Sequence, residues 1–278
     1  MYRVEFPIRS DDEEDMTHRL FDAGAQSVSV EEIDEPGLKM TGIFDRTDML
    51  AQQFPGCPYM VTELEELSWK YRWLEYFQGT ELTAGIFVEP AGYSSPLRHS
   101  YTHVIQLDPR DAFGDGGHPT TRMCAQMLEQ YLDAFDEAGK NEIHMLDVGT
   151  GTGILAIAAS MLGIGRIYAF DIEEDSVARA AENAQRNHCD DIRFFRHDLS
   201  EYRPCMQFPL VTANLLTFII ENNMDTLAGL LQPGGTMILS GIGKEWQDNI
   251  RELFHLHRLQ VVDEMEEGRW KGFMVKRT

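Results

Sequence analysis

The residues best suited to chemistry are a run of glycines that directly follows an apolar segment. Residues 146–153 read LDVGTGTG, so that Gly149, Gly151 and Gly153 alternate with threonines after Asp147. Because glycine has no Cβ, a backbone rich in glycine can turn sharply and come close to a ligand. The apolar segment before the run and the helix-length segment after it predict a strand, a loop and a helix, the context of a nucleoside-binding loop.

Two more acidic residues follow the next two predicted strands. Asp171 lies 20 residues beyond Gly151, a separation at which a carboxylate can accept hydrogen bonds from both ribose hydroxyls. Asp198 follows the third strand and can either reach an adenine amino group or cap a turn. These features fit both NAD and S-adenosylmethionine, since both ligands contain adenosine.

The charge of Asp147 separates these two ligands. A carboxylate next to a pyrophosphate is unfavourable, whereas next to an ammonium and a sulfonium group it is favourable. A dinucleotide loop also generally reads GxGxxG, while this one reads GxGxG. We therefore expect S-adenosyl-L-methionine as the cofactor and methyl transfer as the reaction, with an NAD-dependent oxidoreductase as the alternative.

The glycine-rich run belongs to a region in which short apolar strands alternate with helix-length segments. This alternation predicts a Rossmann-like α/β domain with a mostly parallel, seven-stranded sheet. A closing hairpin, Leu259–Glu264 with Gly272–Lys276, predicts an antiparallel C-terminal strand and fits a methyltransferase better than a dehydrogenase. The other expected strands are Met145–Val148, Arg166–Phe170, Ile192–Arg196, Leu210–Asn214 and Thr236–Ser240, and the expected helices are Ile154–Leu162, Asp175–Asn187, Thr217–Leu231 and Lys244–Phe254.

The N-terminal region predicts a smaller α+β domain of ferredoxin-like type, because its patterns follow the order βαββαβ. We place this substrate-recognition domain at residues 1–66, a helical linker at 67–84 and the methyltransferase domain at 85–278. The linker has an aromatic stripe at helical spacing, Trp69, Trp73 and Phe77. The expected N-terminal elements are strands Tyr2–Ile8, Ser27–Glu31, Lys39–Phe44 and Tyr59–Leu64, a first helix that begins near Ser10, and a second helix over Arg46–Phe54.

The charge of the chain narrows the choice of partners. It has 24 Lys and Arg against 46 Asp and Glu, a formal net charge of -22, which disfavours nucleic acids and anionic membranes. Residues 1–66 contain 16 of the acids and five of the bases. We expect no direct nucleic-acid or membrane binding and an N-terminal docking surface for a basic protein. The alternative is an acidic face that aids solubility alone.

Composition also bears on the compartment. The four cysteines are scattered and form no CxxC pair, which indicates reduced thiols. The acidic N-terminus lacks the basic and apolar stretches of a secretory signal, and the longest weakly polar run, 154–165, is too short to span a bilayer. We expect a cytoplasmic protein, active as a monomer, and no metal site, because the nine histidines lack ligand spacing.

Three further stretches carry a family resemblance. Residues 112–122 read AFGDGGHPTTR, residues 146–159 read LDVGTGTGILAIAA, and residues 213–216 read ANLL. They resemble, in this order, the loop before the glycine-rich motif, the cofactor loop with its helix, and the active-site Asn motif of the ribosomal protein L11 methyltransferases (PrmA family). The resemblance covers about residues 68–278 and implies a class I S-adenosylmethionine-dependent methyltransferase.

The resemblance implies roles for single residues. Asn214 and the backbone carbonyl of Leu215 would accept hydrogen bonds from an amine and aim its lone pair at the methyl group, and Phe113 would cover the transfer site. Asn214 as a helix cap and Phe113 as a core residue are the alternatives, and for Thr121 the alternative is packing. The implied cofactor contacts are Thr121, Gly149, Asp171 and Asn214, to which the strand-end pattern adds Asp147, Gly151 and Asp198.

The substrate implied by the resemblance is ribosomal protein L11, trimethylated on lysine side chains, with its N-terminal amine as a further acceptor. Leu215 and Leu216 stand where glutamine methyltransferases have two prolines, which argues against that branch. Asp115 replaces a threonine that is usual in the family, and it acts either as an added attraction for the sulfonium or as a solvent-facing acid. A methyltransferase for another protein or a small amine, and a non-catalytic interaction protein, remain alternatives.

Overall fold

The computed structural model describes residues 2–8, 12–33, 37–48, 50–63, 79–108, 116–203 and 206–278. They form two compact units, one within residues 1–77 and one that makes up most of residues 78–278. The predicted aromatic stripe of the linker and the loop residues Phe113 and Asp115 lie outside the described residues. None of the described helices combines the length and the apolar character that a bilayer span requires.

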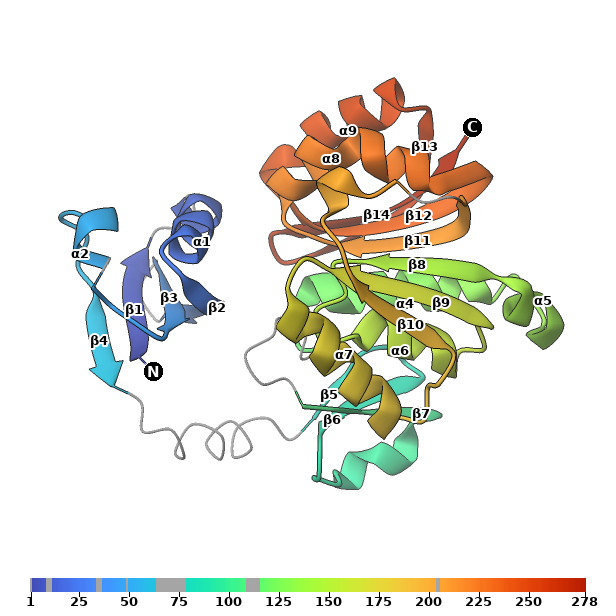
Figure 1. Ribbon diagram of the computed structural model, residues 1–278, viewed down its shortest axis with the longest axis horizontal. Helices are drawn as coiled ribbons and strands as arrows, with labels where there is room; N and C mark the ends of the chain where they lie inside the picture. Colours follow the sequence, from blue (N-terminus) through green and yellow to red (C-terminus); the bar gives the residue numbers. More distant parts are fainter. Residues whose placement is uncertain are drawn as a thin grey trace. The chain divides into compact units, whose positions relative to one another are not determined.

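The first unit has the predicted order of elements, βαββαβ. Its four strands form one antiparallel sheet in the order β2-β3-β1-β4 (Figure 1), which is the ferredoxin-like arrangement. The elements are β1 (Tyr2–Ile8), α1 (Glu13–Asp22), β2 (Ala25–Ile33), β3 (Gly37–Phe44), α2 (Leu50–Gln53) and β4 (Met60–Glu63).

Alternation along β1 decides which face of this sheet is buried. Val4, Phe6 and Ile8 pack against residues of α1 and α2 in one apolar cluster, while Glu5 and Pro7 belong to the opposite face, since successive side chains of a strand point to opposite sides. The second helix is shorter than the predicted Arg46–Phe54. The Leu50 N–H donates to the Thr47 carbonyl at 3.2 Å, so a turn precedes the helix, and the Arg46 guanidinium donates to both carboxylate oxygens of Asp48 at 3.1 and 3.0 Å.

The second unit is built on a seven-stranded sheet in the order β10-β9-β8-β11-β12-β14-β13 (Figure 1). Neighbouring strands pair in parallel except at β14, which runs antiparallel to both β12 and β13. The predicted mostly parallel sheet with an antiparallel C-terminal strand is thus confirmed. The strands are β8 (His144–Val148), β9 (Arg166–Asp171), β10 (Ile192–Arg196), β11 (Phe208–Asn214), β12 (Leu231–Gly243), β13 (Leu259–Glu267) and β14 (Trp270–Arg277).

Helices cover both faces of this sheet (Figure 1). On one face α4 contacts α6 and α7 contacts β9 and β10, and on the other face α8 contacts α9. The helices are α4 (Pro119–Leu132), α5 (Glu137–Glu142), α6 (Ile154–Met161), α7 (Glu174–Arg186), α8 (Thr217–Leu230) and α9 (Gln247–Leu256), with 3-10 turns η2 (Pro96–Ser100), η3 (Leu199–Glu201) and η4 (Lys244–Trp246).

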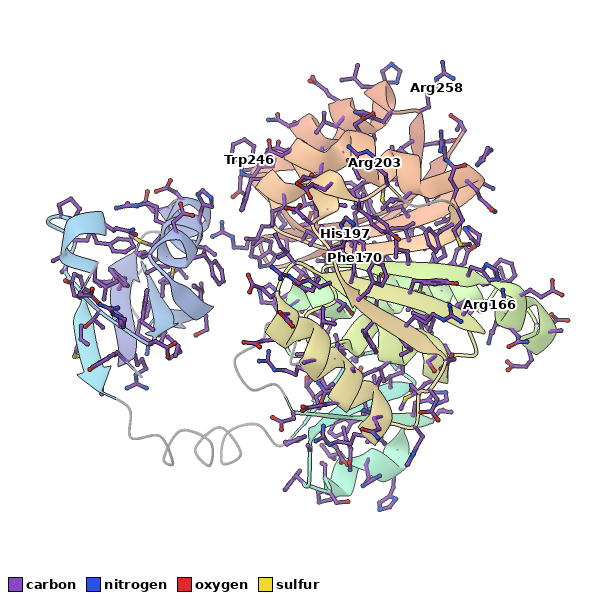
Figure 2. The ribbon with its side chains drawn as sticks, viewed as in Figure 1. Arg166, Phe170, His197, Arg203, Trp246 and Arg258 are labelled. Atoms are coloured by element: carbon purple, nitrogen blue, oxygen red, sulfur yellow. The ribbon has the colours of Figure 1, made fainter. Side chains whose placement is uncertain are left out.

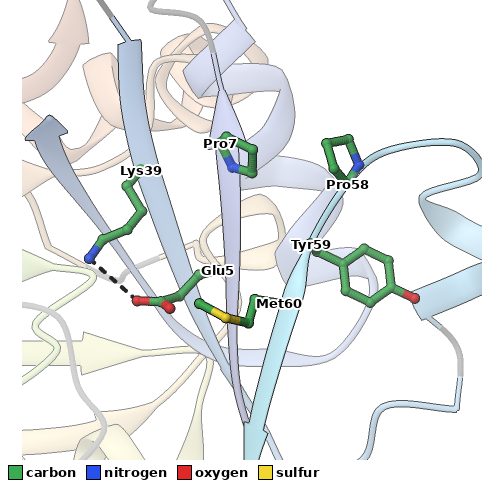
Figure 3. Close-up of a pocket in the computed structure, with 6 residues that line it drawn as sticks. All are labelled: Glu5, Pro7, Lys39, Pro58, Tyr59 and Met60. Carbon is green, nitrogen blue, oxygen red and sulfur yellow. Dashed lines mark ion pairs between the residues drawn. The ribbon is translucent and has the colours of Figure 1, made fainter. Parts of the chain in front are cut away.

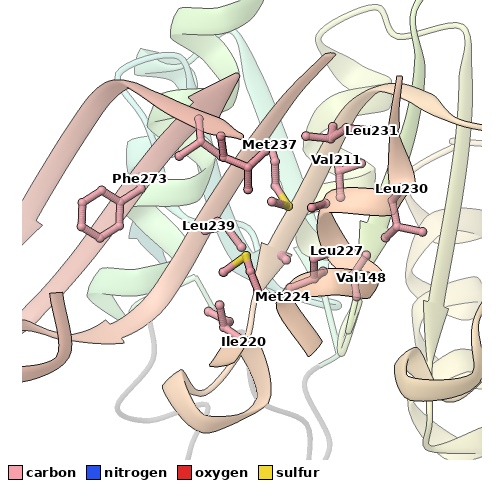
Figure 4. Packing of buried hydrophobic residues seen from close by; sticks show 14 of the residues in the cluster. Val148, Val211, Ile220, Met224, Leu227, Leu230, Leu231, Met237, Leu239 and Phe273 are labelled. Atoms are coloured by element: carbon pink, nitrogen blue, oxygen red, sulfur yellow. The ribbon is translucent and has the colours of Figure 1, made fainter. Parts of the chain in front are cut away.

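An apolar core between the sheet and α8 fixes the central strands. Met224 and Leu227 of α8 belong to the same buried cluster as Val148, Val211 and Leu239 (Figure 4). Complete burial of an aliphatic side chain of this size stabilises the fold by about 1.5–3 kcal/mol. The core therefore holds β8 and β11 side by side at the place where the strand order reverses, which is where open α/β sheets bind ligands.

A small sheet, β5 (Thr80–Glu81), β6 (Ile86–Pro90) and β7 (His103–Leu107), precedes the central sheet. The strand β5 falls within the predicted linker 67–84, although it pairs with β6 of the second unit. Glu89 is wholly buried here, and its carboxylate accepts from the Ser95 N–H and from Gln106 Nε2, each at 3.0 Å. Such distant partners have no signal in the local sequence.

Candidate functional site

The glycine-rich loop between β8 and α6 has the sharp backbone that its sequence predicts. Gly149, Gly151 and Gly153 have φ angles of 68°, 53° and 82°, in the left-handed region that side chains disfavour. The N–H groups of Gly149 and Thr150 both donate to the carbonyl of Phe170 at 3.0 Å. The loop is therefore tied to the end of β9.

Two of these glycines also lie so close to neighbouring segments that a side chain there would meet them. A Cβ on Gly149 would lie 2.4 Å from Leu215 Cδ2, and a Cβ on Gly153 would lie 3.0 Å from the Cβ of Ala180 in α7. A Cβ at 149 would therefore require the Leu215 side chain to move, and a Cβ at 153 would be tighter than most contacts in packed interiors. The loop thus packs directly against the segment after β11 on one side and against α7 on the other.

Asp147 lies beneath this loop, 1% exposed. Its two carboxylate oxygens accept hydrogen bonds from the hydroxyls of Thr150 at 2.7 Å and Thr212 at 2.6 Å. Burial raises the pKa of Asp147 to about 6, against the lowering effect of these two bonds and with a further rise from the charge of Asp171. Asp147 therefore braces the loop. Its direct contact with a cofactor stays a prediction, and the sequence interpretation missed both threonines.

Asp171, at the end of β9, is half-buried. Its Oδ2 accepts from the Gly151 N–H at 2.9 Å, and its Oδ1 accepts from the Glu173 N–H at 3.1 Å. A carboxylate has about four acceptor sites, so both oxygens keep capacity for a vicinal diol. The arrangement suits the predicted ribose contact and ties the residue to the loop as well.

Asp198 caps the turn η3. Its Oδ1 accepts from the Ser200 N–H at 2.8 Å and from the Ser200 hydroxyl at 2.7 Å, and these bonds lower the pKa of Asp198. The capping alternative is thus observed, and the contact with adenine stays a prediction. Beside it the rings of Phe170 and His197 lie 6.3 Å apart and those of His197 and Tyr202 4.9 Å apart, in an aromatic cluster at the ends of β9 and β10 (Figure 2).

Thr121 lies in the first turn of α4, where Pro119 is the first helical residue and His118 is the N-cap. The Thr121 N–H donates to the His118 carbonyl at 3.1 Å and the residue is wholly buried. Its contact with the cofactor stays a prediction. Its hydroxyl accepts from Asn214. The next residue, Arg122, donates to the Gly117 carbonyl and to the Glu267 carboxylate of β13, an anchor that the sequence interpretation missed.

Asn214 ends β11, and its Nδ2 donates to Thr121 Oγ1 at 3.2 Å. The N-cap of α8 is Leu216, so the capping alternative for Asn214 is not observed. The Leu215 N–H donates to the Ser240 carbonyl at 3.1 Å, and a Cβ on Gly241 would lie 2.0 Å from the Leu215 carbonyl oxygen. Glycine at position 241 therefore gives this carbonyl the room it occupies.

The structure brings most of the predicted site residues to one edge of the central sheet. Gly149 touches the segment of Asn214 through Leu215, Asn214 touches Thr121, and Asp171 touches Gly151. Asp198 lies at the end of the neighbouring strand β10. Phe113 lies outside the described residues, so its predicted position over the site is not tested.

The sequence that forms this site is similar to those of known proteins. Residues 38–278 match the family described as ribosomal protein L11 methyltransferase (PrmA). The chain belongs to this family. A ribosomal protein L11 methyltransferase of Thermotoga petrophila is 31% identical over 98% of this chain and 97% of its own length, and one of Heliobacterium modesticaldum is 32% identical over 82% of this chain and 69% of its own length.

A solved structure points to the same family. The ribosomal protein L11 methylase of Lactobacillus delbrueckii subsp. bulgaricus is 30% identical, has a TM-score of 0.63, and covers 73% of this chain and 100% of its own. The expected class, a class I methyltransferase of the PrmA family, is confirmed. The enzyme is a methyltransferase that uses S-adenosyl-L-methionine, as predicted in preference to NAD.

The described residues fit this cofactor. The loop at Gly149 and Gly151 presents backbone without side chains, as close approach of a ligand requires. Asp171 offers a partly exposed carboxylate at the strand end where a ribose is expected. The buried carboxylate of Asp147 contributes negative charge behind the loop, which favours a cationic ligand over a pyrophosphate.

Proposed function

We propose that the enzyme transfers methyl groups from S-adenosyl-L-methionine to lysine side chains of ribosomal protein L11, with the N-terminal amine of that protein as a further acceptor. The names of the relatives that match most of the chain support this substrate. One observation carries the proposed chemistry. Because Asn214 Nδ2 donates to Thr121, the donor side of the amide is engaged and its Oδ1 is oriented as an acceptor.

Two oxygens orient the amine in this proposal, Asn214 Oδ1 and the Leu215 carbonyl oxygen. When bound, S-adenosyl-L-methionine supplies a methyl group that the positive sulfonium has already activated. In the first transfer two N–H groups of the neutral amine donate to these oxygens, which points its lone pair along the remaining direction, toward the methyl group. Each further transfer has one N–H donor fewer, so burial and shape then orient the amine. The protein's contribution is alignment and exclusion of water.

The amine has to lose its proton before it can act as a nucleophile. Burial disfavours the charged form of an amine, and Asn214 and Leu215 offer acceptor oxygens without a formal charge, so they do not hold the extra proton as a carboxylate would. Phe113 covers the reacting atoms in this proposal, and Thr121 acts on the amine through Asn214.

We assign the cofactor contacts to residues at the ends of the three strands β8, β9 and β10. Gly149 and Gly151 allow close approach of the backbone, Asp171 accepts from the ribose hydroxyls, and Asp198 lies toward the adenine. Asp147 acts from below. Its oxygens accept from Thr150 and Thr212, so it shapes the loop and adds negative charge next to the cofactor site.

We also propose that residues 1–66 dock the basic substrate. The sheet face opposite α1 and α2 has a pocket of about 360 Å³ (Figure 3). There Glu5 pairs with Lys39 at 3.3 Å, and Met60 is 60% exposed beside them. An apolar surface next to a carboxylate suits the aliphatic stem and ammonium group of a lysine. The other residues that line the pocket are Pro7, Pro58 and Tyr59.

Surface charge bears on what the enzyme recognises. The acidic surface disfavours direct binding to nucleic acid, so the substrate is recognised as a protein. We expect the enzyme to act as a monomer in the cytoplasm, where ribosomal proteins are available.

The test uses the full-length enzyme, a labelled methyl donor and purified L11 protein, with the labelled sites located by mass spectrometry. We expect trimethylated lysines in wild-type reactions and at most a tenth of that label with Asn214→Ala, a difference of about 1.4 kcal/mol in barrier. No label on L11, together with a different labelled protein in a ribosome-free lysate, would contradict the substrate and leave the methyltransferase class intact.

A further inference from the structure

Asn183 is a wholly buried polar residue in α7. Its neighbours along the helix face are small and apolar, because Ala180 and Ala184 are also buried. A buried amide costs stability unless its donors and acceptors find partners. The partners of Asn183 come from two separate parts of the second unit.

The carboxamide of Asn183 joins the end of β7 to the glycine-rich loop. Its Oδ1 accepts from the Asp108 N–H at 3.0 Å and from the Arg186 guanidinium at 2.9 Å. Its Nδ2 donates to the Thr152 carbonyl at 3.0 Å and to the Asp108 carbonyl at 3.5 Å. One side chain thus connects backbone groups at residues 108 and 152.

Asn187 lies one helical turn later and makes a related but narrower contact. Its Oδ1 accepts from the Gln106 N–H and its Nδ2 donates to the Gln106 carbonyl, both at 2.8 Å. The two asparagines therefore pair with the edge of β7 as a neighbouring strand would. In these contacts Asn183 reaches the glycine-rich loop and Asn187 does not.

The bond to Thr152 completes the support of the loop. Gly149 and Thr150 are held by the Phe170 carbonyl, and Gly151 is held by Asp171. Thr152 is wholly buried, so changing Asn183 removes a buried hydrogen bond from the loop that water does not readily replace.

We infer that Asn183 is a positioning residue for the cofactor loop, which sets the loop's backbone at Thr152 by tying it to α7 and to the end of β7. The inference rests on the proposed cofactor site. It predicts that the affinity for the methyl donor and its product depends on a side chain that does not touch the ligand.

Asn183→Asp tests this, because it keeps the size of the side chain and replaces the Nδ2 donor with an oxygen that faces the Thr152 carbonyl. Asn187→Asp is the matched control, since it makes the same change one turn away. Hydrogen exchange of the unliganded full-length proteins measures the loop directly. We expect faster exchange over residues 149–153 in Asn183→Asp. In Asn187→Asp we expect faster exchange near Gln106 and in the last turn of α7, because Asn187 Nδ2 also donates to the Asn183 carbonyl at 2.8 Å.

Calorimetric binding of S-adenosylhomocysteine is the second measurement. We expect Kd to rise about tenfold in Asn183→Asp, equal to about 1.4 kcal/mol, and to stay within about twofold of wild type in Asn187→Asp. If the aspartate variant does not fold, Asn183→Ala takes its place in both measurements. Unchanged loop exchange and unchanged Kd in a folded Asn183 variant would overturn the inference. Wild-type protein that fails to bind the product would instead contradict the proposed cofactor site, and the exchange experiment would still test the Asn183 contact.

Discussion

Asn214 Nδ2 and Thr121 Oγ1 lie 3.2 Å apart, although 93 residues separate them in the sequence. The bond joins the end of β11 to the first turn of α4, the two places where the sequence resembles its family most specifically. Thr121 is wholly buried, so its hydroxyl is available to Asn214 and not to solvent. The hydroxyl of Thr121 therefore fixes the orientation of the Asn214 amide, so that Thr121 is a positioning residue.

We expect Asn214→Ala to lower kcat for methyl transfer at least about tenfold, about 1.4 kcal/mol in the barrier, because the amine loses one of its two acceptors. Thr121→Val should lower kcat by a smaller factor, since the amide remains but can rotate. Steady-state kinetics with L11 protein measures both effects. Asn223→Ala, which removes a side chain that donates to the Ile219 carbonyl within α8, is the control and should leave kcat unchanged. Wild-type turnover in Asn214→Ala would remove this residue from the mechanism.

Gly149→Ala should weaken binding of S-adenosylhomocysteine about tenfold. An alanine at a φ of 68° is strained by about 1–2 kcal/mol, and its Cβ would lie 2.4 Å from Leu215 Cδ2, so the Leu215 side chain has to move. Gly92→Ala separates the effect of backbone strain from the effect of the contact with Leu215. Gly92 has a φ of 80° but no atom within 4 Å of a Cβ. Calorimetry should give wild-type affinity for Gly92→Ala together with a similar loss of stability; equal affinities in the two variants would contradict the role of Gly149.

Local patterns are sufficient to predict most of the elements that carry this site. Tyr2–Ile8 alternates and forms a strand with those same bounds, and the helix expected at Ile154–Leu162 differs from α6 by one residue. In both segments the signal lies within a few neighbouring residues. The helix expected over Arg46–Phe54 is wrong in its first half, where a turn closed by the Leu50 N–H and the Thr47 carbonyl precedes the helix.

The supports of the site could not be predicted in the same way. Asp147 accepts a hydrogen bond from Thr212, 65 residues away in the sequence, and Arg122 donates to Glu267, 145 residues away. Such pairs depend on strand order, which local periodicity does not specify. One clue was present in the sequence. Thr212 is a polar residue inside an otherwise apolar buried strand, and a polar residue in that position requires a partner.

The stability of the enzyme should depend on Asp147 in a defined pH window. Burial raises the pKa of Asp147 to about 6 from its ordinary value of 3.8. Between these values the folded protein holds a proton that the unfolded chain has released, so the contribution of this group to stability falls as pH rises and levels off above about pH 6. Asp147→Asn does not titrate. The free energy of unfolding of this variant relative to wild type should therefore increase by about 2 kcal/mol between about pH 4 and about pH 7.

Asp198→Asn should show the opposite pH dependence of stability in the same experiment. Hydrogen bonds from Ser200 lower the pKa of Asp198, so its contribution is present above the ordinary pKa and is lost as pH falls below it. Thermal unfolding followed across the pH range distinguishes the two variants. A pH-independent difference between Asp147→Asn and wild type would contradict the raised pKa.

The acids of the first unit should control the rate at which the basic substrate is captured. Neutralising five of them to Asn should raise KM for L11 protein at least about threefold near physiological ionic strength, and the effect should disappear at high salt, because surface charges are screened within about 8–10 Å. Affinity for S-adenosylhomocysteine should not change. These acids lie on α1, at its N-cap and between β3 and α2, so they test the charge of the unit and not the pocket at Glu5. The five exposed acids are Asp12, Asp15, Asp22, Asp45 and Asp48.

A matched set in the second unit distinguishes docking from net charge. The same neutralisation of five exposed acids there changes the total charge equally but leaves the N-terminal surface intact, and it should have little effect on KM. If both sets slow the reaction equally, the acidic N-terminal surface aids general attraction or solubility and has no docking role. The control acids are Asp133, Glu137, Glu182, Asp225 and Glu252.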